Sequence, residues 1–176
     1  MARRHPEIRQ FAANAEMNDF LTEFQGESDR AAAVLGPAVL DDLLGQLIAA
    51  SLVSTPLAKD LLGVNKPLGA FGARISVAQA MGLISEDEAK DLNRVREIRN
   101  KFAHHLQGLT FTNQSIRESC KHFRCVAAAL ASNEQFAAEF PPGARFAFNF
   151  TTALLAMHLT KRIARAAAPT AAASPW

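Results

Sequence analysis

A long run with almost no charge is the feature that most limits how this chain can fold. Between residues 31 and 58, Asp41 and Asp42 are the only charged side chains. A helix that is apolar on nearly every face must be buried against several neighbours. Ser28 supplies an N-cap for such a helix, which we expect to run to about Val53 with a bend or local break at Pro37. The sequence therefore predicts a helix at the centre of a bundle.

The rest of the chain also favours helices. Apolar residues make up 49% of the 176 residues and charged residues 20%, and Tyr is absent. A capping box of Ser85 and Glu88 marks one helix start. Apolar spacing and stop signals predict helices over about residues 11–26, 56–63, 70–81, 86–106, 113–131 and 145–165. We expect an all-α, single-domain, multi-helix bundle over residues 1–166, with its core at about 17–165 and a mobile Ala/Pro-rich tail at 167–176.

Charge and reactive residues exclude several classes of protein. The net charge of +2 is too small to predict binding to nucleic acid or membranes by charge alone. The apolar stretches at 43–58 and 146–159 are shorter than the roughly 18 residues of a membrane span. Cys120 and Cys125 cannot bridge within one helix, and no histidine has the spacing of a metal site. We expect a cytoplasmic protein without metal or cofactor.

The predicted helix over residues 86–106 carries an arginine inside its apolar stripe. On a helical wheel, Arg99 falls about 40° from the middle of that stripe. A buried arginine needs a carboxylate, and Asp41 and Asp42 in the central helix are the first candidates, with Asp29 third. The prediction is an internal salt bridge. The alternative is that Arg99 opens into a cleft and takes part in chemistry.

Residues 99–104 read Arg-Asn-Lys-Phe-Ala-His. This resembles the Arg-Asn-x-x-x-His motif of the HEPN superfamily, helical domains that include metal-independent ribonucleases. The resemblance implies a catalytic trio of Arg99, Asn100 and His104, in which the arginine stabilises charge on the phosphate and the histidine handles protons. Arg99 and His104 lie about 140° apart on an ideal helix. A HEPN-type endoribonuclease acting on RNA across a dimer interface is therefore the alternative function.

A wider pattern consists of blocks at residues 27–30 (Glu-Ser-Asp-Arg), 40–44 (Leu-Asp-Asp-Leu-Leu), 67–75 (Pro-Leu-Gly-Ala-Phe-Gly-Ala-Arg-Ile), 81–84 (Met-Gly-Leu-Ile) and 96–104. In this order they resemble the mannitol operon repressor family (MltR-like) over about residues 24–131. The resemblance implies an all-helical transcriptional regulator that lacks a recognised DNA-reading motif and acts through a protein partner. Ala31 stands where a glycine is expected, and the Ala-rich tail is atypical, so the pathway need not be mannitol.

The charged residues of these blocks are the candidate site. We expect a polar network that either binds a partner or holds the fold together, and its members are Glu27, Asp29, Arg30, Asp41, Asp42, Arg74 and Arg96. A separate basic ridge of Arg117, Lys121 and Arg124 is typical of a solvated helix face, with contact to an acidic partner or RNA as the alternative. We expect the partner to be another protein, and a homodimer is an alternative.

Direct reading of DNA is not expected. Residues 74–89 imitate a helix-turn-helix, with Ala78, Gly82 and Ser85 at the small, turn and second-cap positions. Glu88, however, occupies a position that should be apolar, and the carboxylates at residues 86–88 would repel phosphate from the would-be recognition helix. We therefore predict no specific DNA binding by the isolated chain.

Overall fold

The computed structural model describes residues 24, 26–105, 108–132 and 143–166. Their helices are α2 (Asp29–Ser51), α3 (Pro56–Leu61), α4 (Phe71–Ala80), α5 (Glu86–His104), α6 (Gln114–Lys121), α7 (Arg124–Ser132) and α9 (Ala144–Ala166). No strand occurs among these residues, which confirms the predicted all-α class. The helix predicted before Phe24 and the tail at 167–176 lie outside the described residues.

Helix α2 is the predicted central helix. The Ser28 side chain accepts a hydrogen bond from the Ala31 N–H at 3.2 Å and caps its start. The expected break at Pro37 does not occur: the helix is continuous to Ser51, and Gly36 and Pro37 are both buried within it.

Helix α2 is apolar over most of its length. By length and composition α2 would suffice to cross a membrane, with 44% of its most apolar window buried. Counting uninterrupted apolar stretches missed this window because Asp41 and Asp42 lie inside the helix. A buried core helix meets the same criterion, and α2 packs against α4, α5 and α9.

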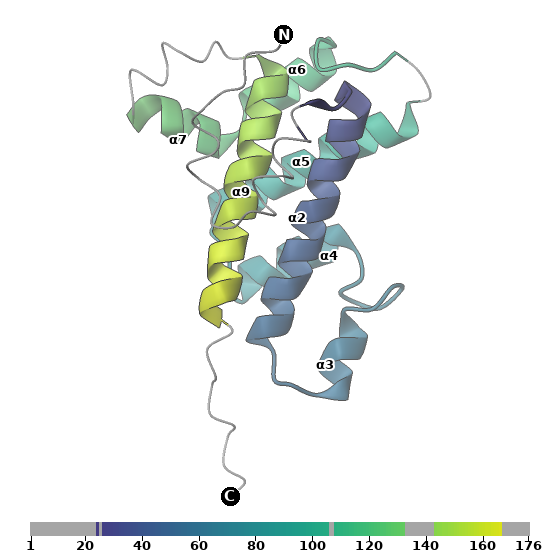
Figure 1. The fold of residues 1–176 in the computed structure, drawn as a ribbon, viewed down its shortest axis with the longest axis vertical. Helices are drawn as coiled ribbons and strands as arrows, with labels where there is room; N and C mark the ends of the chain where they lie inside the picture. The colour runs from purple at the N-terminus through teal and green to yellow at the C-terminus, as the bar shows by residue number, and fades with distance from the viewer. Residues whose placement is uncertain (1–23, 25, 106–107, 133–142, 167–176) are drawn as a thin grey trace, which may run out of the picture.

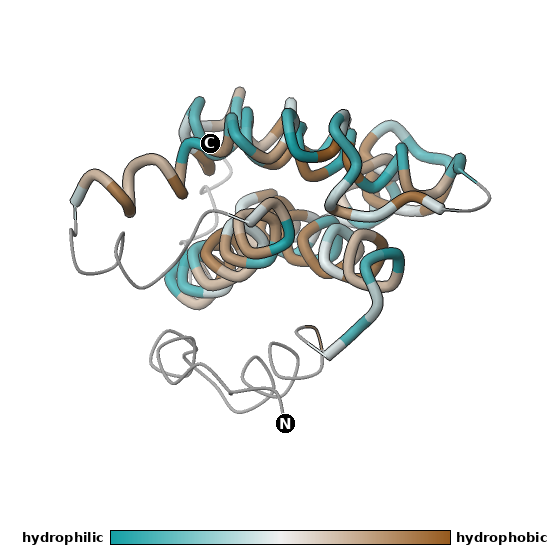
Figure 2. Tube along the Cα trace, turned by 90° about the horizontal axis from the view of Figure 1, so that it is seen from above, coloured by the Kyte–Doolittle hydropathy of each residue, from teal (hydrophilic) through white to brown (hydrophobic). Residues whose placement is uncertain are grey.

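The helices form two layers. Helices α2 and α9 lie side by side and run in the same direction, and α5 crosses behind both (Figure 1). Seen from above, the α2–α9 pair lies below the layer that holds α5 and α7, and hydrophobic segments run through both layers (Figure 2). At Gly36 a Cβ atom would lie only 2.9 Å from Cγ2 of Thr152 on α9. This glycine therefore lets the two long helices approach closely.

The predicted capping box starts α5. The Ser85 side chain accepts from the Glu88 N–H at 3.2 Å, and the Glu88 carboxylate accepts from the Ser85 N–H at 2.8 Å. The apolar stripe of α5 then enters the core, where Phe102 packs against Phe111 with ring centroids 5.2 Å apart. This end of α5 is thus fixed by the core while its outer face meets solvent.

The single helix expected over residues 113–131 is two helices, α6 and α7. Asp91 of α5, only 1% exposed, accepts hydrogen bonds from the N–H groups of Arg124 and Cys125 at 2.8 and 2.9 Å. These are the first N–H groups of α7, which have no partner inside their own helix. A residue from another helix therefore caps α7 and sets the break after Lys121, and sequence spacing gave no sign of it.

Candidate functional site

The prediction that Arg99 is buried in an internal salt bridge is wrong. Its side chain is exposed, and its Nη1 donates to Oδ1 of the neighbouring Asn100 at 3.0 Å. Among the described residues no carboxylate forms a salt bridge with it. Arg99 lies next to the stripe, but its long side chain carries the guanidinium outward to water.

Asp41 is paired with Arg74 instead. Arg74 donates to Oδ1 of Asp41 at 2.8 Å, and its side chain is only 15% exposed. It also donates to the carbonyl oxygens of Asp41, Leu62 and Leu68 at 3.1, 3.1 and 2.8 Å. Arg74 thus joins α2, the loop after α3 and α4. Asp42 stays outside this network, is exposed, and accepts from the Gln46 side chain at 2.7 Å.

Asp29 belongs to a second network at the start of α2. Its Oδ1 lies 2.8 Å from Nη1 of Arg145 on α9, and its Oδ2 accepts from the Phe111 N–H at 2.8 Å. Arg145 also donates to the carbonyl oxygens of Phe24 and Glu27 at 3.3 and 3.1 Å. Of Glu27 only the backbone takes part. Sequence reasoning missed Arg145, since nothing local marks the first turn of α9 as the partner of a residue 116 positions earlier.

Arg30 and Arg96 complete the predicted set. Arg30 donates to the carbonyl oxygen of Phe102 at 2.7 Å and also to that of His105, at the C-terminal end of α5. A cation there complements the helix dipole. The Arg96 guanidinium lies over Gly72 of α4, where a Cβ would be 3.6 Å from its Cζ, and its buried Nε has no hydrogen-bond partner among the described residues. The predicted set is therefore divided among separate contacts rather than gathered in one site.

The residues of the HEPN-like motif lie on the last turns of α5. Arg99 and His104 are exposed and Asn100 is partly exposed. His104 is the last residue of the helix. Arg99 and Asn100 are joined by the hydrogen bond given above, and none of the described hydrogen bonds joins either to the His104 side chain.

A groove lies between α6, α7 and the start of α9. Its volume is about 230 Å³, and its apolar lining includes Phe123, Val126, Leu130 and Ala147. Arg117 and Lys121 of α6 form its charged rim. The sequence analysis included these two cations in a basic ridge together with Arg124, which does not line the groove, and it did not predict the apolar floor beside them.

Cys120 is buried and lines this groove, and Cys125 on α7 is partly buried. Burial raises the pKa of Cys120 and of Cys125 to about 12, so both are protonated at neutral pH. The Cys125 thiol lies 3.1 Å from the Thr151 hydroxyl of α9. Among the described residues, no three His, Cys, Asp or Glu side chains are grouped to hold a metal ion.

Comparison with known proteins adds to this geometry. The family model described as mannitol repressor (MtlR) matches residues 40–151. No curated protein matches significantly. Among solved structures, the chain is similar to that of the X-ray structure of the MtlR-HPr complex from Escherichia coli, with a TM-score of 0.67 and 18% identity over 84% of this chain and 99% of that chain. The matched residues run from α2 into α9 and include both Asp41 and Arg74, and the chain belongs to the mannitol repressor family.

Proposed function

We propose that this protein is a cytoplasmic transcriptional regulator that acts through a protein partner, and that the partner is an HPr-like protein. The observation that carries the proposal is the family match over residues 40–151. It is supported by the likeness of fold to the Escherichia coli MtlR chain, whose X-ray structure is that of a complex with HPr.

The surface of α4 and α5 also supports action through a partner. Helix α5 would be the recognition helix of a helix-turn-helix, but Glu86 and Asp87 are exposed in its first turn. Glu88 is held by Arg162 and His158 of α9. Carboxylates at this position repel DNA phosphate.

Two titrations test the proposal with the full chain. Isothermal titration with HPr from the same organism should show saturable binding. Anisotropy with labelled DNA from the candidate operator should show no preference over scrambled DNA. Specific affinity for the operator in the usual range of about 10⁻⁸–10⁻¹¹ M, or absence of HPr binding, would contradict the proposal.

The HEPN-type ribonuclease is the second candidate function. The observation that favours it is the exposure of Arg99, whose guanidinium is free of any described carboxylate and lies on the same helix end as Asn100 and His104. A site that takes Arg99 from one subunit and His104 from the other needs a dimer. Cleavage of labelled RNA should then survive a metal chelator and disappear in His104→Ala.

Mixed dimers test the geometry of that second candidate. If each site takes one residue from each chain, mixing Arg99→Ala with His104→Ala subunits restores one intact site per dimer. Cleavage by a strict monomer, or cleavage that is unchanged in His104→Ala, would remove the ribonuclease from consideration.

A further inference from the structure

The charges of the chain are unevenly distributed. Residues 94–124 contain seven Lys and Arg against two Asp and Glu, although the whole chain has a net charge of only +2. This segment comprises the second half of α5, all of α6 and the first residue of α7. The rest of the chain is therefore net negative, and the basic character is local.

The groove between α6, α7 and α9 adjoins this basic segment. Arg117 and Lys121 stand on one rim, and the start of α9, which carries the positive end of its helix dipole, stands on the other at Gly143 and Ala144. Lys121 is paired with Glu118 at 2.7 Å, but both side chains are more than half exposed, so the pair is open to exchange. Arg117 is exposed and belongs to none of the described salt bridges.

The floor of the groove is apolar, in contrast to its charged rim. Phe123 lies in the turn before α7, Val126 and Leu130 lie on α7, and Ala147 lies on the first turns of α9. At about 230 Å³ the groove is smaller than the roughly 300–1,000 Å³ of typical small-molecule pockets. It offers space for apolar side chains of a docked segment, as when an amphipathic helix lies in a groove.

We infer that this groove is the docking site for an acidic, amphipathic segment of a partner protein. Charge complementarity selects that occupant: apolar side chains fill the floor, and carboxylates beside them meet Arg117, Lys121 and the start of α9. This docking site is independent of the proposed function. If the groove binds no acidic segment, HPr binding or repression through another surface is still unaffected.

A synthetic peptide tests the docking site on the full-length protein. The probe is a fluorescein-labelled helical peptide of about 15 residues with Leu and Phe on one face and Glu on the other. Its matched control carries Lys in place of every Glu. We expect the acidic peptide to bind, with an affinity that falls as salt rises, and the Lys peptide not to bind.

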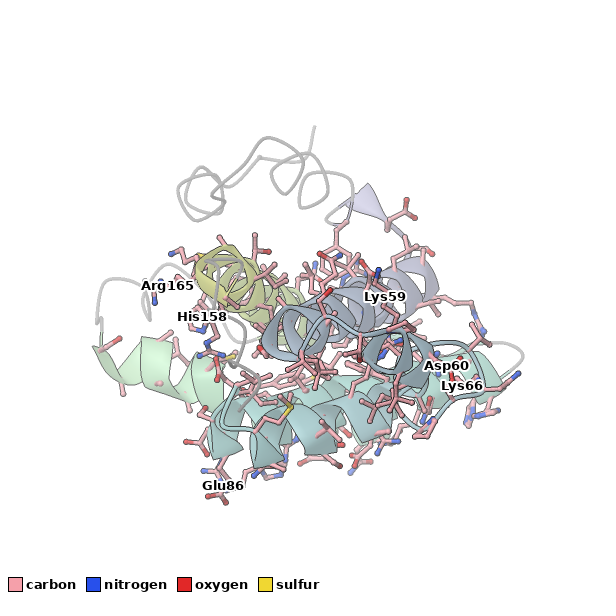
Figure 3. All side chains as sticks on the ribbon, turned by 90° about the horizontal axis from the view of Figure 1, so that it is seen from below. Lys59, Asp60, Lys66, Glu86, His158 and Arg165 are labelled. Atoms are coloured by element: carbon pink, nitrogen blue, oxygen red, sulfur yellow. The ribbon has the colours of Figure 1, made fainter. Side chains whose placement is uncertain are left out.

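Two pairs of variants locate the binding. The double substitution Arg117→Glu/Lys121→Glu should lower the affinity at least about tenfold. Lys59→Glu/Lys66→Glu makes the same change of charge near α3 and should leave affinity unchanged; Lys66 there is paired with Asp60 as Lys121 is with Glu118. Figure 3 shows Lys59, Asp60 and Lys66 together, away from His158 and Arg165 of α9. Helices α3 and α6 lie towards opposite ends of the molecule (Figure 1).

The second pair leaves charge unchanged. Ala127→Trp fills the groove and should abolish binding, whereas Ala128→Trp, equally exposed on the same helix but not part of the groove lining, should not. Circular dichroism and thermal melting of each variant verify folding. The inference is overturned if the acidic peptide does not bind, if the Lys peptide binds equally well, or if Ala127→Trp binds like wild type. It is also overturned if sedimentation shows a dimer that only Ala127→Trp dissolves, because the occupant is then a second copy.

Discussion

The junction of α2 with α4 and the C-terminal end of α5 each carry an arginine from the family-like blocks, yet the two arginines have different surroundings. Arg74 is 15% exposed and donates to the Asp41 carboxylate and to three backbone carbonyls. Arg99 is exposed, and its one hydrogen bond among the described residues goes to the side chain of its neighbour Asn100. The comparison shows that proximity to an apolar stripe does not bury an arginine. Burial requires acceptors that converge from several elements, because each N–H needs a partner.

The largest expected effect is at Arg74. Arg74→Ala leaves the Asp41 carboxylate and the Leu62 and Leu68 carbonyls without their donor. Removing one partner of a largely buried pair costs about 3–5 kcal/mol, so the unfolding free energy should fall by an amount near that range. Urea unfolding followed by circular dichroism measures it.

The lysine variant separates charge from geometry at the same position. Arg74→Lys keeps the positive charge but cannot reach all four oxygens of α2 and the loop after α3 at once, so it should recover only part of the loss. A stability of Arg74→Ala equal to that of wild type would contradict the claim that this junction depends on the guanidinium.

Asp91 tests a second inner contact, with a smaller expected effect. Asp91→Ala leaves the Arg124 and Cys125 N–H groups without their acceptor, and the cost should be about 1–3 kcal/mol. Asp91→Asn retains one side-chain oxygen and should lose less. Hydrogen exchange at the two N–H groups should accelerate in both variants, and unchanged exchange would show that α7 does not depend on this cap.

The elements whose signals are local were predictable from the sequence. Ser28 caps α2, Thr55 caps α3 with Pro56 following, and the Ser85–Glu88 box starts α5, because each signal lies within three residues of the bond it makes. The break between α6 and α7 was not predictable, since its cause is Asp91, 33 residues before the N–H that it binds.

The residues of the candidate site were likewise predictable only where the signal is local in the sequence. The family-like blocks identified Asp29, Arg30, Asp41 and Arg74 as network members, but not which residues they bind. The choice of partner depends on how α2, α4 and α9 pack together, and the sequence spacing of Arg99 favoured the wrong arginine. Arg145 was missed because its contacts with Asp29 and Phe24 exist only after α9 lies beside α2.

Acid titration tests the other end of α5. Burial alone would raise the pKa of Glu88, but hydrogen bonds from Arg162 and the Ser85 N–H, and the nearby His158, outweigh it and hold the pKa below 4.5. A carboxyl with a lowered pKa stabilises the fold above its ordinary pKa, and this contribution is lost as pH falls through the lowered value.

The variant Glu88→Gln isolates that contribution. It should be less stable than wild type at neutral pH, by about 1 kcal/mol, and the difference should shrink as the pH falls below the ordinary carboxyl range. A difference that stays constant over the acid range would show that the ionised form of Glu88 adds nothing to the α5–α9 contact.

The smallest expected effect on stability is at Arg99, and it tests the contrast between Arg99 and Arg74 directly. Because its side chain is exposed and, within the described part of the chain, bonds to Asn100 alone, Arg99→Ala should change the unfolding free energy by no more than about 0.5 kcal/mol. His104→Ala, at the exposed end of the same helix, should behave alike. A loss as large as that of Arg74→Ala would mean that Arg99 supports the fold after all. If Arg99→Ala leaves the unfolding free energy unchanged, the fold does not require an arginine at this position. The exposed end of α5 can then serve contact with another molecule.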